Sequence, residues 1–150
     1  MATSAVVPLS IPTLQLLAKE IATTFTLDPA LVCAIIEQES SWNPWAIRYE
    51  PAFYAHYVMP QRGLTATEAY ARAFSWGLMQ IMGEVAREEG FHGDLPSLCD
   101  PHTGIVAGCN HFKRKLDNAE GGIQQALLAW NGGSNQQYPE QVLARVSKYR

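Results

Sequence analysis

Glu39 is the residue of this 150-residue chain whose position best suits acid–base chemistry. Val32, Ile35 and Ile36 recur at the spacing of an apolar helix face, and the same spacing makes Glu39 the next residue on that face. Glu39 also lies in the last turn of the predicted helix, where the helix dipole is negative. Burial and the dipole both raise the pKa of a carboxyl, which is what a general acid at near-neutral pH requires.

A purely structural role for Glu39 is the alternative, in which its carboxylate pairs with a buried arginine such as Arg48. Glu37, two residues earlier, falls on the opposite face of the helix with Ala30 and Ala34, so we expect a solvated charge there. The two glutamates therefore have different predicted environments on one helix, and Glu39 is the candidate catalytic residue.

Aromatic and amide side chains are concentrated in segments whose composition is typical of loops. Flat aromatic faces together with amides suit a neutral polymer rich in hydroxyl groups, such as a glycan. Aromatic residues at helical spacing are also common in cores, and Trp130 and Tyr149 individually fit a core position. The groove candidates are Trp42, Trp45, Trp76, Trp130, Tyr49, Tyr54, Tyr57 and Tyr138, with the amides Gln38, Asn43, Gln80 and Asn131.

The overall composition is that of one globular domain. Hydrophobic residues make up 47% of the chain and charged residues 17%, and a chain of this length buries roughly two-thirds of its unfolded surface. The net charge of −3 includes no basic run, so nothing indicates nucleic-acid binding. The longest apolar run, residues 30–36, is far shorter than the roughly 18 residues of a membrane span. We expect a monomer that binds neither nucleic acid nor membrane.

The cysteines and histidines do not fit a disulfide or a zinc site. Cys109 and His111 would lie about 200° apart around a helix, so they cannot share a metal with Cys99 and His102. A bond between Cys99 and Cys109 would have to span about 12 Å along the same helix. We expect reduced, buried cysteines, with Cys33 as the third, and neither a metal nor a cofactor.

Apolar periodicity and capping residues predict an all-α fold, or an α fold with one minor hairpin. Asp28-Pro29 and Asp100-Pro101 are typical helix starts, and Thr65 opens a capping box. The predicted helices run over about residues 12–25, 29–41, 66–73, 75–82, 84–89, from 101 past 116, from 123 to 131 and from 139 to 149.

The domain organisation follows from the same pattern. Residues 1–150 are predicted to form a single domain, in which residues 1–26 supply an N-terminal packing helix. Residues 45–74 have weaker periodicity, and we expect an extended aromatic loop or hairpin excursion there. Gly104 and Gly108 lie four residues apart on one predicted helix, which indicates close approach of a neighbouring backbone.

Four segments in sequence order resemble the motifs of the soluble lytic transglycosylase domain, a family related to goose-type lysozyme. They span about residues 27–149, most of the chain. The segments are Ile36-Glu37-Gln38-Glu39-Ser40-Ser41-Trp42-Asn43-Pro44, Gly77-Leu78-Met79-Gln80-Ile81-Met82, Ala129-Trp130-Asn131-Gly132-Gly133, and Tyr138 with Val142. The resemblance implies a lysozyme-like α-helical fold and cleavage of the bond between N-acetylmuramic acid and N-acetylglucosamine in peptidoglycan.

The resemblance also implies roles for individual residues. Glu39 matches the family's single catalytic acid, which is the residue that helix periodicity selects independently. Ser40 matches a serine near the cleavage site, and Met79 and Gln80 match groove residues. The remaining substrate-binding candidates in these and adjoining segments are Trp130, Asn131, Tyr138, Tyr49, Glu50 and Ser75.

The sequence departs from the family pattern at two places. Trp130 replaces the tyrosine of the family's Tyr-Asn-x-Gly turn, so the phenolic hydroxyl near the catalytic acid is expected to be missing, with an indole N–H donating instead. The 32 residues from Trp45 to Trp76 exceed the short turn usual in the family. We expect residues 48–51 to form a wall or lid over the glycan groove.

On the family pattern the reaction is lytic transglycosylation. Glu39 would protonate the glycosidic oxygen and then remove the proton from the muramic acid 6-hydroxyl, which leaves a 1,6-anhydro end and consumes no water. If Glu50 or Glu68 reached the opposite face of the sugar, it would position a water, and the enzyme would be a hydrolysing muramidase. A third alternative is a non-catalytic peptidoglycan-binding module within a larger envelope structure.

The first residues of the sequence bear on how the protein would reach the cell wall. The first 25 residues lack the basic start and apolar stretch of a secretory signal. We expect an enzyme that resembles a phage-type endolysin, held in the cytoplasm until it is released to the cell wall, with another delivery route as the alternative. The net charge of −3 gives no attraction to an anionic wall, so aromatic and amide side chains are expected to supply binding.

Overall fold

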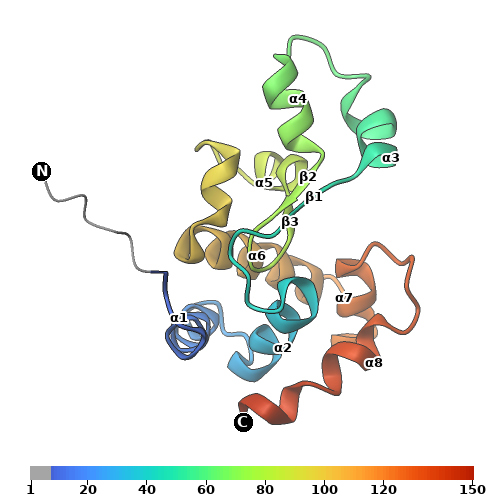
Figure 1. The fold of residues 1–150 in the computed structure, drawn as a ribbon. Coiled ribbons are helices and arrows are strands. Elements are labelled where there is room, and N and C mark those ends of the chain that lie inside the picture. The colour runs from blue at the N-terminus through green and yellow to red at the C-terminus, as the bar shows by residue number, and fades with distance from the viewer. Residues whose placement is uncertain (1–7) are drawn as a thin grey trace, which may run out of the picture.

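Helices make up most of the structure, a computed structural model that describes residues 8–150 (Figure 1). A small sheet lies between a lower group of helices and an upper lobe. The predicted mainly α, lysozyme-like fold class is confirmed. The α-helices are α1 (Ile11–Thr24), α2 (Pro29–Ser40), α3 (Pro51–Phe53), α4 (Ala66–Arg72), α5 (Gly83–Glu88), α6 (Pro101–Asp117), α7 (Gly122–Trp130) and α8 (Tyr138–Leu143).

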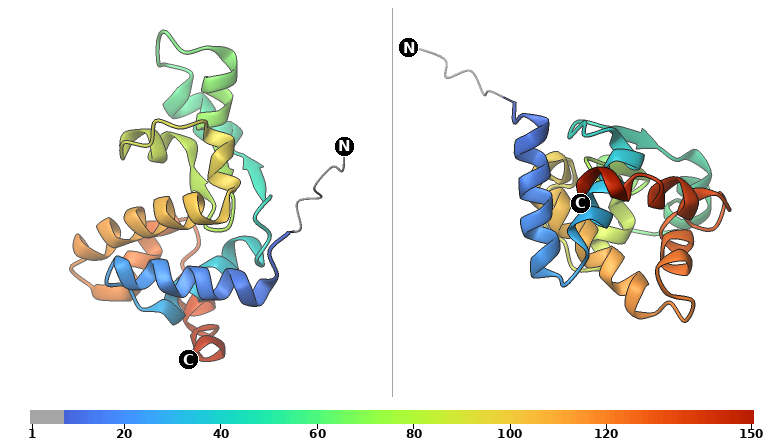
Figure 2. Two further views of the ribbon diagram at one scale, coloured as in Figure 1. Left: turned by 90° about the vertical axis from the view of Figure 1, so that its left-hand side faces the viewer. Right: turned by 90° about the horizontal axis from the view of Figure 1, so that it is seen from below.

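Helix α2 is the centre of the larger core. Helices α1 and α8 and the C-terminal 3-10 turn η3 (Val146–Tyr149) pack around it, as the view from below in Figure 2 shows. Residues 30–36 are all buried, so the predicted polar face with Ala30 and Ala34 is wrong, because neighbours cover this part of the helix on every side. Its predicted start is confirmed, because the Asp28 carboxylate accepts the N–H of Ala30 at 3.0 Å.

Helix α1 and the C-terminal segment both pack on this core. Helix α1 lies within the predicted N-terminal packing segment 1–26, of which residues 1–7 fall outside the described part. At the other end, the single helix predicted over residues 139–149 is divided into α8 and η3. Within residues 8–150, every helix is too short or too polar to cross a membrane.

The sheet is antiparallel with the order β1-β2-β3. Its strands are β1 (Ile47–Tyr49), β2 (Phe74–Trp76) and β3 (Ile81–Met82). Ser75 pairs with Arg48 on one side and with Met82 on the other, so the helix predicted over residues 75–82 is wrong. Gly77 has a φ of +71° and Gln80 a φ of +50°. These left-handed residues reverse the chain between β2 and β3, where a helix would need negative φ throughout.

The excursion predicted at residues 45–74 is present as a projecting lobe with α3 and α4 at its far end (Figure 1). Tyr49 is central to it, with ring-centroid distances of 5.3 Å to Phe74 and 6.0 Å to Tyr70. Tyr54, in the π-helical turn η1 (Tyr54–Val58), stacks on Tyr70 at 4.8 Å. The lobe is therefore built from short helices joined by a cluster of partly exposed aromatic rings. The predicted capping-box helix is confirmed as α4.

Close packing surrounds helix α6, which contacts the 3-10 turn η2 (Leu95–Cys99). A Cβ at Gly104 would lie 2.3 Å from the carbonyl oxygen of Leu98, so the predicted close backbone approach is confirmed there. At Gly108 a Cβ would lie 2.4 Å from the sulfur of Met79, so the close neighbour is a side chain. The three cysteines are free and buried.

Candidate active site

Glu39 lies near the end of α2, where this helix meets α7 and α8. Its Oε1 accepts hydrogen bonds from the indole Nε1 of Trp130, at 3.1 Å, and from the hydroxyl of Tyr138. Trp130 is the last residue of α7 and Tyr138 the first residue of α8. Two helix ends distant in the sequence therefore converge on one carboxyl oxygen, and the indole donor predicted at Trp130 is confirmed.

Burial dominates the proton affinity of Glu39. Desolvation raises the pKa of its carboxyl above the ordinary value, while the hydrogen bonds from Tyr138 and Trp130 and the charge of Arg48 oppose the rise. Burial and the charge of Glu39 also raise the pKa of the Tyr138 hydroxyl, which stays a donor at neutral pH. Because Oε1 receives both hydrogen bonds, the proton of the acid belongs on Oε2. This arrangement has the chemistry of a general acid.

Arg48 is not the buried partner that a structural role for Glu39 requires. Its side chain is 74% exposed, and its Nε pairs with Glu50 Oε1 at 3.0 Å. Arg48 therefore influences Glu39 through its charge, while Glu50 is engaged by an exposed arginine.

A phenolic hydroxyl is present beside Glu39, contrary to the prediction that it would be missing. It comes from Tyr138 at the start of α8. Tyr138 is 3% exposed, so its ring belongs to the core and its hydroxyl is directed at Glu39. Tyr138 belongs to the fourth matching motif, so the sequence indicated that it is part of the site. Only the fold shows that its hydroxyl reaches Glu39.

Ser40 connects Glu39's helix to the turn between β2 and β3, and Gln80 connects this turn to the segment before β1. The Ser40 hydroxyl donates to the carbonyl oxygen of Leu78 at 2.8 Å. The amide of Gln80 donates to the carbonyl oxygens of Ala46 and Gly77, both at 2.9 Å. These bonds hold the turn against α2 and against the segment that enters the lobe.

The other substrate-binding candidates have protein partners of their own. The Met79 side chain is fully buried against Gly108, and the buried Ser75 hydroxyl donates to the sulfur of Met82 at 3.1 Å. Tyr49 is partly exposed and packs against Phe74 and Tyr70 in the aromatic cluster of the lobe. Asn131 follows α7, and its amide donates to Ser134 at 3.5 Å.

Glu37 is not the solvated charge that was predicted. Its carboxylate accepts hydrogen bonds from Lys148 at 2.7 Å and from the Tyr149 hydroxyl at 2.9 Å, and it pairs with Arg145 at 3.1 Å. These donors come from the C-terminal segment, which lies against the face of α2 that was expected to meet solvent. Helix periodicity alone does not reveal that this segment returns to α2.

His111 is a neighbour of the site that sequence reasoning considered only as a zinc ligand. Its ring lies against Trp130 with centroids 5.4 Å apart, and both residues line a cavity of about 90 Å³ with Gln80. Residue spacing does not indicate this contact, because His111 and Trp130 belong to different helices. Across residues 8–150, no three histidine, cysteine, aspartate or glutamate side chains gather as metal ligands would.

A comparison with family models identifies the family of the chain. No solved structure matches the chain. A family model described as the transglycosylase SLT domain matches residues 17–142, which include Glu39, Trp130 and Tyr138. Such a domain degrades peptidoglycan by cleaving its glycan strands. Because the match covers most of the chain, the protein belongs to the transglycosylase SLT domain family.

Proposed function

We propose that the protein cleaves the β-1,4 bond between N-acetylmuramic acid and N-acetylglucosamine, with Glu39 as both the acid and the base of a lytic transglycosylase. The observation that carries this proposal is the partly buried Glu39 carboxyl, whose Oε1 is held by Trp130 and Tyr138. Burial raises its pKa, so the carboxyl is protonated at higher pH than an ordinary glutamate. The two donors fix the orientation of Oε2, which holds the proton.

The reaction needs one carboxyl and no water. Glu39 transfers its proton to the glycosidic oxygen as the bond between that oxygen and the anomeric carbon breaks, and the N-acetyl group of the muramic acid stabilises the positive charge on that carbon. The Glu39 carboxylate then removes the proton of the 6-hydroxyl as the 6-oxygen bonds to the anomeric carbon. The product is a 1,6-anhydro end, and Glu39 regains its proton.

The positions of the other candidate carboxylates favour this reaction over hydrolysis. Glu68 accepts hydrogen bonds from Arg87 at 2.7 Å and from Arg72 at 2.9 Å. Glu50 pairs with Arg48 at 3.0 Å. The hydrogen bonds from Arg87 and Arg72 lower the pKa of the Glu68 carboxyl, so this carboxylate is a weak base. This supports a single-carboxyl mechanism.

Mass spectrometry of the fragments released from purified peptidoglycan tests the proposal. We expect 1,6-anhydromuramic acid ends, whereas fragments heavier by one water would identify a hydrolase. Glu39→Gln should abolish release, because the amide has no proton to give to the glycosidic oxygen. Glu88→Gln, at an exposed position away from Glu39, is the control and should keep activity. Binding to peptidoglycan without any release by the wild-type protein would instead identify a non-catalytic module.

A further inference from the structure

A second, largely buried acid, Glu89, lies behind the Glu39 site and is paired with a histidine. Glu89 Oε1 and His111 Nδ1 are 2.6 Å apart, and their side chains are only 14% and 15% exposed. A carboxylate oxygen only accepts, so the Nδ1 carries the proton of this bond. The mechanism proposed above uses neither residue.

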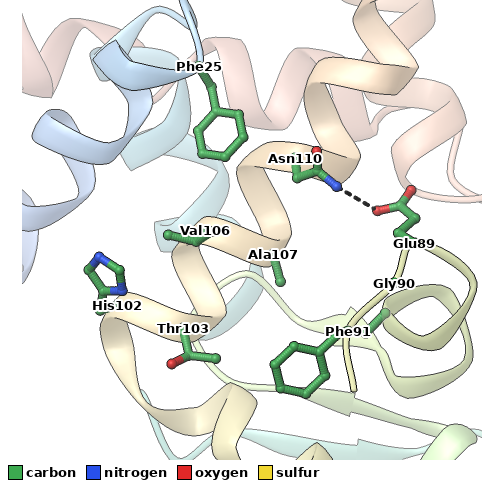
Figure 3. A pocket seen from close by; sticks show the side chains of 10 residues that line it. Phe25, Glu89, Gly90, Phe91, His102, Thr103, Val106, Ala107 and Asn110 are labelled. Carbon is green, nitrogen blue, oxygen red and sulfur yellow. Dashed lines mark hydrogen bonds between the residues drawn. The ribbon is translucent and has the colours of Figure 1, made fainter. Parts of the chain in front are cut away.

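Both oxygens of Glu89 have donors on α6. Oε1 accepts the hydrogen bond from His111. Oε2 accepts a bond from the amide of Asn110 at 3.5 Å, and Figure 3 shows this second bond at the edge of a cavity of about 440 Å³. Arg114 adds a positive charge at 4.0 Å. Glu89 follows the last residue of α5, so it joins the end of this helix to the middle of α6. The carboxylate is therefore fixed, and it in turn fixes the plane of the His111 ring.

The His111 ring forms one wall of the site that holds Trp130. Its centroid lies 5.4 Å from that of the indole, and Phe112 meets the indole edge-on at 5.7 Å. The indole carries one polar atom, Nε1, and this atom donates to Glu39 at 3.1 Å. A tilt of the indole between these two neighbours would move that donor away from Glu39.

We propose that Glu89 and His111 are positioning residues, which hold the Trp130 indole in its hydrogen bond to Glu39. The inference rests on the proposed function. It adds residues of α6 and of the end of α5 to a site formed by α2, α7 and α8. His111 touches neither Glu39 nor the substrate in this scheme. It acts through Trp130, which stands where the family resemblance places a tyrosine. The indole is larger than a phenol ring, and the His111 ring packs against it.

The consequence for Glu39 has a definite sign. A donor to a carboxylate stabilises the charged form, so loss of the Trp130 bond raises the pKa of Glu39. The charged and titratable groups around the chain of contacts are Tyr138 and Arg48 at Glu39, and Glu89 and Arg114 at His111. His111→Ala and Trp130→Phe spare these four groups, so these two variants isolate the effect of the indole.

Titration of ¹³C-labelled glutamate carboxyls by NMR measures the effect without relying on activity, with Glu39→Gln used to assign the Glu39 signal. His111→Ala and Trp130→Phe should each raise the Glu39 pKa, and the double variant should raise it no further, because one route carries both effects. In peptidoglycan cleavage, His111→Ala should lower kcat by about tenfold or more, with KM little changed. His102→Ala, on the same helix, is the control and should leave both readings unchanged.

Glu89 provides a second route if His111→Ala fails to fold. Glu89→Gln keeps an acceptor for His111 and should behave like the wild type, whereas Glu89→Ala should raise the Glu39 pKa. An unchanged Glu39 titration in His111→Ala, or additive shifts in the double variant, would overturn the inference. An active Glu39→Gln would instead overturn the proposed function, so the two failures are distinguishable.

Discussion

At the scale of single residues, two glutamates on one helix have opposite environments. Burial raises the pKa of Glu39. The hydrogen bond from Lys148 instead lowers the pKa of Glu37, against a smaller effect of burial. Neither result follows from residue type, because both side chains are glutamates in the same turn of α2. The neighbouring donors and the depth of burial decide which carboxyl can hold a proton.

Glu39→Gln is expected to stabilise the protein at neutral pH. The folded-state pKa of Glu39 is raised, so its contribution to stability is complete below the unfolded value of about 4.3 and is lost as the pH rises through the folded-state pKa. Glutamine does not ionise, and its carbonyl oxygen accepts the same two hydrogen bonds. In urea unfolding, the variant should have the higher free energy of unfolding at about pH 8. The difference between variant and wild type should shrink toward about pH 4, by about 1.4 kcal/mol for each unit by which the folded-state pKa exceeds the unfolded-state pKa. A wild-type protein more stable than the variant at the higher pH would contradict this.

Tyr138→Phe is expected to change the pH dependence of catalysis. The variant loses one of the two donors to Glu39 Oε1, so the pKa of Glu39 rises and the fall in kcat/KM at high pH moves to higher pH. The weaker hold on the carboxyl should also lower kcat by about tenfold to hundredfold. Tyr149→Phe is the matched control, because that hydroxyl donates to Glu37. A shift of the same size in both variants would argue against a specific role for Tyr138.

At the scale of elements, local signals located most helices and failed at the sheet. Asp28, Thr65 and Asp100 cap helices where they were predicted, since each capping bond forms within three residues along the chain. The segment from Ser75 to Met82 is apolar enough for a helix but forms the end of β2, a turn and the whole of β3. Its conformation depends on pairing with β1, in which Arg48, 27 residues earlier in the chain, is the partner of Ser75. Periodicity has no access to such a distant partner.

Gly77→Ala is expected to destabilise this turn strongly. The added Cβ would lie 2.5 Å from the carbonyl oxygen of Leu98, and the residue has a φ of +71°. Gly63→Ala is the matched control, because its φ is +81° and no atom lies within 4 Å of the added Cβ. Both variants carry the cost of left-handed backbone, about 1 kcal/mol, and Gly77→Ala should lose about 2 kcal/mol more in urea unfolding because of the clash. Equal losses would show that the contact with Leu98 relaxes easily.

At the scale of the whole molecule, the C-terminal segment closes the fold over α2. Lys148, Arg145 and Tyr149 meet Glu37, and Arg150 pairs with Asp28 at the start of the same helix at 2.8 Å. The indole of Trp42 also donates to the Tyr149 hydroxyl at 3.0 Å. Both ends of α2 are thus tied to the last residues of the chain. This arrangement holds α8, and with it Tyr138, against Glu39.

Glu37→Gln is expected to destabilise the protein at neutral pH. The folded-state pKa of Glu37 is lowered, so its contribution is present above the unfolded value of about 4.3 and is lost as the pH falls through the folded-state pKa. The partners are partly exposed, which limits the loss to about 1 kcal/mol at low salt. Thermal unfolding at neutral and acidic pH checks this, with the exposed Glu88→Gln as control. A difference that grows on acidification would have the wrong sign.

The sequence by itself determined the mainly α fold, the helix starts with local caps and the inward Glu39, because these depend on residues within one or two turns of each other. It also indicated the indole donor at Trp130 through the motif. Only the tertiary structure decided that Tyr138 donates to Glu39, that Glu37 is paired, and that His111 supports Trp130. Those contacts join α2, α6, α7, α8 and the C-terminus. Burial and hydrogen bonding across such distances depend on how helices pack, which periodicity along one helix does not encode.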